Sequence, residues 1–182
     1  MQQINNKVVL ITGGTKGIGL GIAEALVKEG ARVAITGRNK QTADEAAKYL
    51  NDLGTGKALG LVADVRQYGD QQRAVETVLN TWGKLDVLVA NAGLGYFESI
   101  ESLTIDQWNE TIDTNLTGVF FSIKASLDAL KKSQGYIITM ASLAGTNFFP
   151  RASAYNASKF GLVGFTQAVM LDVRQYGVKV TT

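Results

Sequence analysis

Tyr155 and Lys159 are a residue pair that could transfer protons, and Ser142 lies upstream of them. The two are four residues apart, so on a helix both side chains lie on one face and can enter one pocket. A free tyrosine has a pKa of about 10, and a neighbouring cation lowers that pKa by favouring the phenolate. The pair could therefore donate or accept a proton near neutral pH, and the Ser142 hydroxyl could stabilise negative charge on a carbonyl oxygen. Taken alone, the same spacing also fits a core ring beside a solvated lysine.

The composition excludes several other kinds of catalytic site. The 182 residues include no cysteine and no histidine. A Ser-His-Asp triad is therefore excluded, as are disulfides and a metal site built on imidazole or thiolate, and we expect no metal. The net charge is only +2 and the basic residues are scattered, so no nucleic-acid surface is expected.

The sequence also predicts a protein that does not bind membranes. No apolar run approaches membrane-spanning length. The N-terminal residues 1–7 lack the apolar core of a signal peptide. We therefore expect a soluble, cytoplasmic protein.

Short apolar runs alternate with longer amphipathic stretches, as in successive βαβ units. Strands are predicted at residues 8–11, 33–35, 59–63, 87–90, 136–140 and 178–180. Helices are predicted at residues 17–29, 41–53, 71–82, 106–130 and 153–176. Glycines that follow helical patterns predict left-handed helix ends at Gly30, Gly54, Gly83 and Gly177. The expected fold is α/β, a Rossmann-like doubly wound parallel sheet forming a single domain over residues 1–182.

A glycine-rich turn follows the first predicted strand and could bind a pyrophosphate. The turn reads Thr12-Gly13-Gly14-Thr15-Lys16-Gly17-Ile18-Gly19. Glycine allows the backbone to approach phosphate closely, and the helix that follows offers free N–H groups at its positive end. An ordinary turn could also be rich in glycine, but the position between first strand and first helix favours a dinucleotide site.

The end of the second strand predicts NADP(H) in preference to NAD(H). It reads Ile35-Thr36-Gly37-Arg38-Asn39 and lacks the acidic residue that would bond the ribose hydroxyls. Arg38 could instead pair with a 2′-phosphate, and Lys16 could reach the same group. The alternative is that both are solvated surface cations.

Taken together, these motifs resemble the short-chain dehydrogenase/reductase family. The matching residues are Thr12, Gly13, Gly17, Gly19, Asp64, Val65, Asn91, Ala92, Gly93, Asn115, Ser142, Tyr155 and Lys159. The resemblance implies that Tyr155 is the general acid in carbonyl reduction and the base in alcohol oxidation. It implies that Lys159 lowers the Tyr155 pKa and holds the nicotinamide ribose, while Ser142 orients the substrate carbonyl.

The resemblance also implies roles for residues around the cofactor. Asn115 would place a water that links Lys159 to solvent, and Asp64 would accept a hydrogen bond from the adenine amino group. Asp64 could instead be a turn residue, Ser142 a turn cap and Asn115 a helical asparagine bonded to nearby backbone. The predicted cofactor contacts are Gly13, Thr15, Lys16, Gly17, Ile18, Gly19, Arg38, Asp64, Val65, Asn91, Ala92, Gly93, Tyr155 and Lys159.

Family members usually continue beyond the last strand with a Pro-Gly turn and a helical substrate lid. The resemblance therefore predicts that this chain is C-terminally incomplete, binds cofactor weakly and turns over poorly. An alternative to the reductase is a truncated, non-catalytic dinucleotide-binding relative or scaffold. The presence of Asn115, Ser142, Tyr155 and Lys159 favours the reductase, because a scaffold needs no tuned phenol.

The substrate class implied is a small carbonyl or alcohol. Five residues after strand ends could line an apolar pocket, or belong to an interface or the core: Leu94, Tyr96, Leu143, Phe148 and Phe149. The predicted helices 106–130 and 153–176 carry apolar residues on more than one face, so one face can pack on the sheet and another on a partner. The resemblance implies a homodimer or homotetramer through these helices.

Overall fold

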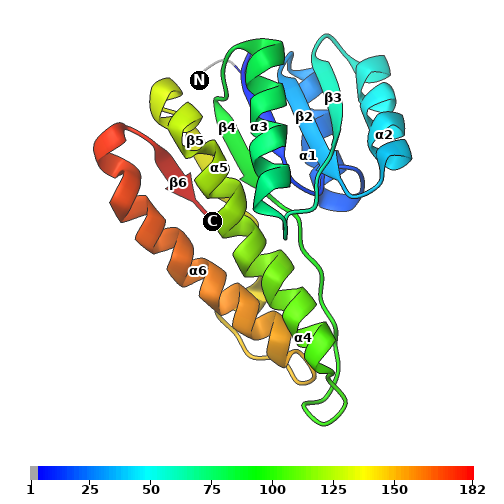
Figure 1. The fold of residues 1–182 in the computed structure, drawn as a ribbon, viewed down its shortest axis with the longest axis vertical. Helices are drawn as coiled ribbons and strands as arrows, with labels where there is room; N and C mark the ends of the chain where they lie inside the picture. The colour runs from blue at the N-terminus through cyan, green and yellow to red at the C-terminus, as the bar shows by residue number, and fades with distance from the viewer. Residues whose placement is uncertain (1–3) are drawn as a thin grey trace.

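The sheet has six parallel strands in the order β3-β2-β1-β4-β5-β6 (Figure 1). The computed structural model describes residues 4–182, so residues 1–3 of the N-terminal segment lie outside the described residues. The strands are β1 (Val8–Ile11), β2 (Arg32–Gly37), β3 (Lys57–Val62), β4 (Val87–Ala90), β5 (Tyr136–Thr139) and β6 (Lys179–Thr181). Each predicted strand is present close to its predicted bounds, and the Rossmann-like fold is confirmed.

Helices cover both faces of the sheet, as continuous apolar strands require. In β1, Val8 and Leu10 point into one hydrophobic core, whereas Val9 and Ile11 point into the other. The first core is completed by α3 (Tyr68–Trp82), α5 (Gly118–Ser133) and α6 (Ser153–Val173), and the second by α1 (Gly17–Lys28) and α2 (Lys40–Leu53). The strands are thus buried between two helical layers, which fixes the positions of their carboxyl ends.

The strand order reverses between β1 and β4. The chain builds β2 and β3 on one side of β1 and then returns to pair β4 on the other side, with Ile11 beside Val89. In open α/β sheets, ligands bind beyond the carboxyl ends of the strands at such a switch point. The glycine turn after β1 and Asn91 after β4 both lie there.

The predicted continuous helix over residues 106–130 is wrong. The segment consists of α4 (Ile105–Ile112), a π-helical turn η1 (Asp113–Thr117) and α5. Asn115 lies inside the wide turn, and its fully buried side chain bonds Leu94 and Ser158. The apolar periodicity continues on both sides of the turn, which is why the sequence pattern predicted one helix. Such single π turns often occur at functional sites.

Three of the four glycines predicted to end helices in the left-handed region do so, with φ of 82° at Gly30, 77° at Gly83 and 73° at Gly177. The prediction for Gly54 is wrong, because its φ of −164° is extended. There a side chain would be crowded, since a Cβ would lie 3.2 Å from the Val27 carbonyl oxygen.

Beyond the sheet, α4 and the first turns of α6 form a projecting lobe below the strands (Figure 1). The predicted helix 153–176 is α6 followed by a 3-10 turn η3 (Arg174–Tyr176). Within residues 4–182, no helix combines the length and apolar character that crossing a bilayer requires.

Candidate active site

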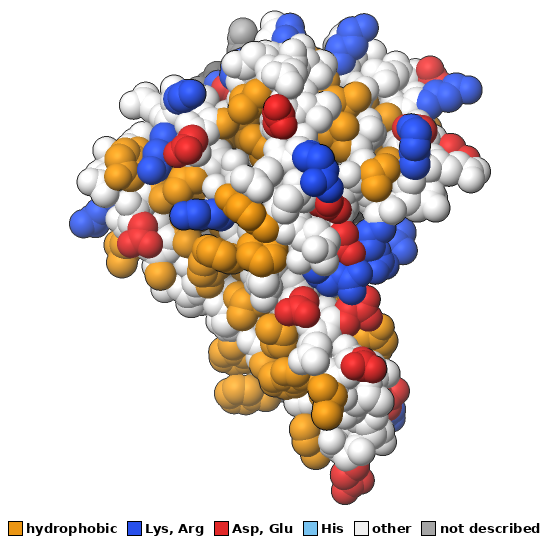
Figure 2. Space-filling model, viewed as in Figure 1, with side chains coloured by type: hydrophobic (Ala, Val, Ile, Leu, Met, Phe, Trp, Pro, Cys, Tyr) orange, Lys and Arg blue, Asp and Glu red, His pale blue; other side chains and the backbone are white. Residues whose placement is uncertain are grey.

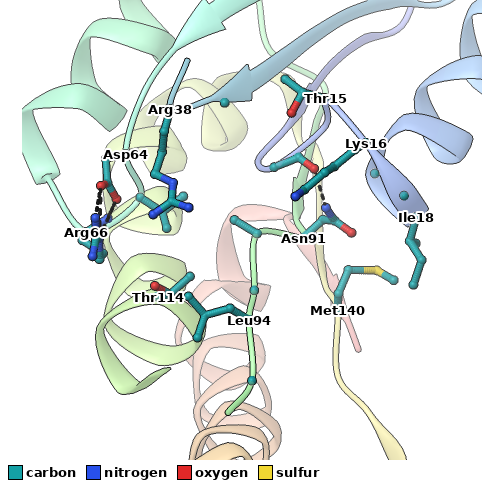
Figure 3. A pocket seen from close by; sticks show the side chains of 18 of the residues that line it. Thr15, Lys16, Ile18, Arg38, Asp64, Arg66, Asn91, Leu94, Thr114 and Met140 are labelled. Atoms are coloured by element: carbon teal, nitrogen blue, oxygen red, sulfur yellow. Dashed lines mark hydrogen bonds and ion pairs between the residues drawn. The ribbon is translucent and has the colours of Figure 1, made fainter. Parts of the chain in front are cut away.

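A cleft of about 650 Å³ opens at the carboxyl ends of the strands (Figure 3). Every residue predicted to contact the cofactor lines it, from Gly13 in the first loop to Lys159 in α6. Of the predicted catalytic residues, Tyr155 and Lys159 line the cleft, whereas Asn115 and Ser142 lie outside its lining. Leu94, a candidate for a substrate pocket, also lines it, and the lining residues that the sequence reasoning missed are Gly37, Ala63, Arg66, Gly95, Phe97, Thr114, Met140 and Ala141.

Thr12 and Asn91 hold the glycine loop against the end of β4. The Asn91 side-chain amide donates to the carbonyl oxygens of Thr12 and Gly13, at 2.9 and 3.1 Å. In return, the Thr12 hydroxyl accepts from the backbone N–H groups of Asn91 and Ala92, at 3.0 and 3.1 Å. This packing leaves no room at Gly19, where a Cβ would lie 2.5 Å from the Asn91 amide nitrogen.

The start of α1 suits an anion. Lys16 precedes the helix and its side chain makes no capping hydrogen bond, so the first N–H groups of α1 lack a side-chain acceptor. Gly17 and Gly19 line the cleft at this helix end, and the backbone can approach a ligand closely there. In Figure 3 the side chains of Lys16 and Arg38 extend into the same space from opposite sides. These residues fit a dinucleotide whose pyrophosphate faces the helix end.

Tyr155 and Lys159 share one face of α6, as predicted. Lys159 is only 6% exposed, and its ammonium donates to the Met140 carbonyl oxygen at 2.6 Å. Burial lowers the pKa of Lys159 below its usual value. Its Nζ lies 5.7 Å from the centre of the Tyr155 ring, which also packs 5.6 Å from the Phe97 ring. A half-buried phenol and a buried ammonium therefore meet in one cleft.

Ser142 begins a short 3-10 turn and caps it, because its hydroxyl accepts from the Ala144 N–H at 3.1 Å. This is the turn-capping alternative that the sequence left open. A hydroxyl that accepts one hydrogen bond keeps its own hydrogen, so Ser142 remains able to donate to a substrate oxygen. Asn156 in α6 fixes the same loop by donating to the carbonyl oxygens of Ala144 and Asn147, at 2.8 and 2.6 Å.

The Asn115 side chain connects two distant segments. Its oxygen accepts from the Leu94 N–H at 2.9 Å, and its nitrogen donates to the Leu94 carbonyl and the Ser158 hydroxyl, at 2.7 and 3.0 Å. Ser158 in turn donates to the Tyr155 carbonyl oxygen at 2.8 Å. Both N–H bonds of the Asn115 amide are therefore used by protein atoms. The alternative that Asn115 bonds the nearby backbone of its own helix is wrong, because its backbone partner is Leu94 in the loop after β4.

Asp64 is paired with an arginine that the sequence reasoning missed. Arg66 donates to both carboxylate oxygens of Asp64, at distances down to 2.6 Å, and holds the pKa of Asp64 below its usual value. Arg66 also reaches Glu110 of α4 at 3.3 Å. The spacing of Asp64 and Arg66 could have signalled their pairing, but nothing local links either to Glu110.

The five apolar or aromatic candidates for a substrate pocket separate in the structure. Leu94 lines the cleft, but the Tyr96 hydroxyl donates to Glu110 at 2.6 Å. Leu143, Phe148 and Phe149 are exposed outside the cleft lining. Phe97, not among the candidates, lines the cleft beside Tyr155.

Residues 7–182 match the family model described as short chain dehydrogenase. The chain is 35% identical over 179 residues to a 3β-hydroxysteroid dehydrogenase of Mediterraneibacter gnavus, covering 98% of this chain and 64% of that protein. It is 36% identical over 180 residues to a 3-oxoacyl-acyl-carrier-protein reductase of Vibrio harveyi, covering 98% of this chain and 72% of that one. The chain thus belongs to the short-chain dehydrogenase family, a family of oxidoreductases.

A solved structure extends the comparison to three dimensions. The alcohol dehydrogenase of the archaeon Thermococcus sibiricus, complexed with 5-hydroxy-NADP, superposes with a TM-score of 0.89 at 31% identity. The match covers 92% of this chain and 72% of that one. The sheet and its helical layers are therefore those of the family.

Replacing Gly19 by alanine should disrupt the glycine loop. Because the new Cβ would lie 2.5 Å from the Asn91 amide and 2.6 Å from the Gly13 carbonyl oxygen, we expect Gly19→Ala to lose about 1–3 kcal/mol of unfolding free energy. Gly21→Ala is the matched control on the same helix, since nothing lies within 4 Å of its Cβ position. We expect it to gain about 0.5–1 kcal/mol from helix propensity. Urea unfolding measures both, and equal stability of the two variants would contradict the loop geometry.

Proposed function

We propose that this protein transfers a hydride between NADP(H) and a carbonyl or secondary alcohol substrate, with Tyr155 as the general acid and base. One observation carries the proposal: Tyr155 and the buried Lys159 line the same cleft as the glycine loop. The fit of that loop to a dinucleotide supports a nicotinamide cofactor, which would supply or accept the hydride.

Tyr155 and Lys159 have complementary tasks in this proposal. In reduction, the Tyr155 hydroxyl donates its proton to the carbonyl oxygen, and in oxidation the phenolate takes the proton back. One N–H of Lys159 is used by Met140, so two others are free to contact a ribose hydroxyl. The Met140 carbonyl holds the ammonium beside the ring.

Ser142 and Asn115 support the reacting groups differently. The Ser142 hydrogen is free to bond the substrate oxygen and to stabilise charge that develops there. Asn115 acts through Ser158 and Leu94, because its amide holds the backbone of Tyr155 and the loop after β4 in place. We therefore assign the Asn115 side chain a positioning role; because both of its N–H bonds are used by protein atoms, the relay water that the resemblance implied would have to donate to an Asn115 oxygen.

The preference for NADP(H) over NAD(H) rests on Arg38 and Lys16. Both line the cleft, and no acidic residue stands at the end of β2 to bond ribose hydroxyls. The bound 5-hydroxy-NADP in the Thermococcus sibiricus relative supports the same choice. The names of the relatives, a steroid dehydrogenase and a ketoacyl-type reductase, support a carbonyl or secondary alcohol as substrate.

Tyr155→Phe tests the acid–base role. Removing the hydroxyl should lower kcat for ketone reduction by about 10²–10⁴-fold, because the proton donor is lost while the ring remains. NADPH affinity, followed by fluorescence, should change little. Tyr49→Phe on α2, an exposed ring outside the cleft, is the control. Reduction that continues at the wild-type rate in Tyr155→Phe would exclude the proposed role.

Arg38→Ala tests the cofactor preference. Loss of a charge-assisted contact to the 2′-phosphate should weaken NADPH binding by about ten- to a hundredfold and leave NADH binding almost unchanged. Lys40→Ala removes the same charge two residues further along, from an ammonium that pairs with Asp44 at 2.7 Å. An equal loss for both dinucleotides in Arg38→Ala would argue against pairing with the phosphate.

The protein should also form a homodimer, or a homotetramer built from such dimers, through α5 and α6. Exposed apolar side chains on these helices are Phe120, Phe160, Met170 and Leu171. Hydrophobic side chains gather over this region on the face shown in Figure 2. An apolar face that the fold itself leaves uncovered is suited to a second copy of the same helices.

Light scattering at micromolar concentration should give the mass of a dimer or tetramer for the wild type and of a monomer for Phe120→Glu. The substitution places a charge in the apolar face. Tyr49→Glu is the matched control, because Tyr49 is 44% exposed on α2 and Phe120 is 45% exposed on α5. A monodisperse monomer of the wild type would contradict the proposed assembly.

A further inference from the structure

Glu110 contacts both arginines at one end of the cleft. Its Oε1 lies 3.3 Å from NH1 of Arg66 and 3.6 Å from NH1 of Arg38. Arg38 and Arg66 line the cleft, whereas Glu110 lies outside the lining, on α4. The Glu110 carboxylate therefore contacts the two guanidinium groups without lining the cleft itself.

The two arginines at this end of the cleft are balanced by two carboxylates. Arg66 pairs with Asp64 at 2.6 Å and shares Glu110 with Arg38. Two cations thus face two carboxylates. The Arg38 side chain is 66% exposed, so it can turn from the carboxylate toward a ligand without losing a packed position. A bound phosphate would have to compete with Glu110 for Arg38.

A third contact fixes Glu110 itself. The Tyr96 hydroxyl donates to its Oε2 at 2.6 Å, and this hydrogen bond raises the pKa of Tyr96. Oε1 faces the arginines and Oε2 faces Tyr96, so the carboxylate is held between them. A glutamine at this position could still accept from Tyr96 but would carry no charge toward Arg38 or Arg66.

We propose that Glu110 sets the strength of dinucleotide discrimination by competing with the 2′-phosphate for Arg38. The inference rests on the proposed function, because it places the adenosine ribose at this end of the cleft. Glu110 does not touch the reacting atoms; it determines how much positive charge is available to a phosphate. Removing its charge should strengthen binding of ligands that carry a 2′-phosphate more than binding of ligands that lack one.

Glu110→Gln tests the inference through a ratio of affinities. NADPH and NADH are titrated by fluorescence, and adenosine 2′,5′-bisphosphate and 5′-AMP by calorimetry, on the full chain. The NADPH to NADH affinity ratio should rise about tenfold, because one like charge near the phosphate is removed. The adenosine bisphosphate to AMP ratio should rise in parallel.

Asp106→Asn is the matched control. It removes one negative charge from the same helix, and Asp106 is exposed and forms no ion pair within residues 4–182. Its affinity ratio should equal that of the wild type. In an Arg38→Ala background, Glu110→Gln should change the affinity ratio little, because the guanidinium for which Glu110 and the phosphate compete has been removed. If Glu110→Gln does not fold, Glu110→Asp, whose shorter carboxylate withdraws from both arginines, should raise the ratio by a smaller factor.

The outcomes separate the two proposals. An unchanged ratio in Glu110→Gln, or an equal rise in Asp106→Asn, would overturn the role of Glu110 while leaving the reductase proposal standing. A wild type that binds neither dinucleotide nor the adenosine bisphosphate would overturn both. Because the measure is a ratio, it applies whichever dinucleotide the wild type prefers.

Discussion

The hydrogen bonds between Thr12 and Asn91 hold together two segments that leave the sheet in diverging directions. β1 and β4 are neighbours, and their pairing ends where the glycine loop begins. The side chains of these two residues continue the connection by bonding backbone groups across the gap. The loop is then held against β4 although its glycines offer no side chains for support, and Gly17 and Gly19 at the start of α1 stay at the cleft. The position of α1 and the shape of the cleft both follow from this connection.

Side-chain amides provide the same kind of support elsewhere in the site. Asn115 bonds both backbone groups of Leu94, and Asn156 bonds the loop that carries Ser142. An amide can donate and accept at once, so it satisfies irregular backbone where no strand or helix partner exists. Three asparagines thus fix three loops relative to rigid strands and helices. Tyr155 and Lys159 can then stand on a regular helix, while the irregular parts around them are immobilised.

Much of this arrangement could be predicted from sequence, because its signals are local. Apolar runs located the strands, and the spacing of Tyr155 and Lys159 placed them on one helical face. The π turn at Asn115 could not be predicted, since the apolar pattern continues through it and the contact that stabilises it comes from Leu94, far away in sequence. The pairing of Arg38 and Arg66 with Glu110 was missed for the same reason, as α4 packs there only after folding. Ion pairs that form between distant segments produce no periodic pattern in the sequence.

The π turn also makes the length of one segment matter. Each residue turns an α-helix by about 100°. The five-residue π turn therefore makes the faces of α5 point in other directions than they would if α4 continued as a regular α-helix. α4 can direct Glu110 toward the arginines while α5 directs Val119 and Ile123 into the core beneath the sheet. Deleting one residue would restore an unbroken helix at little local cost, yet it would force α4 or α5 to face the wrong way. The number of residues in this segment is therefore constrained as well as the identity of Asn115.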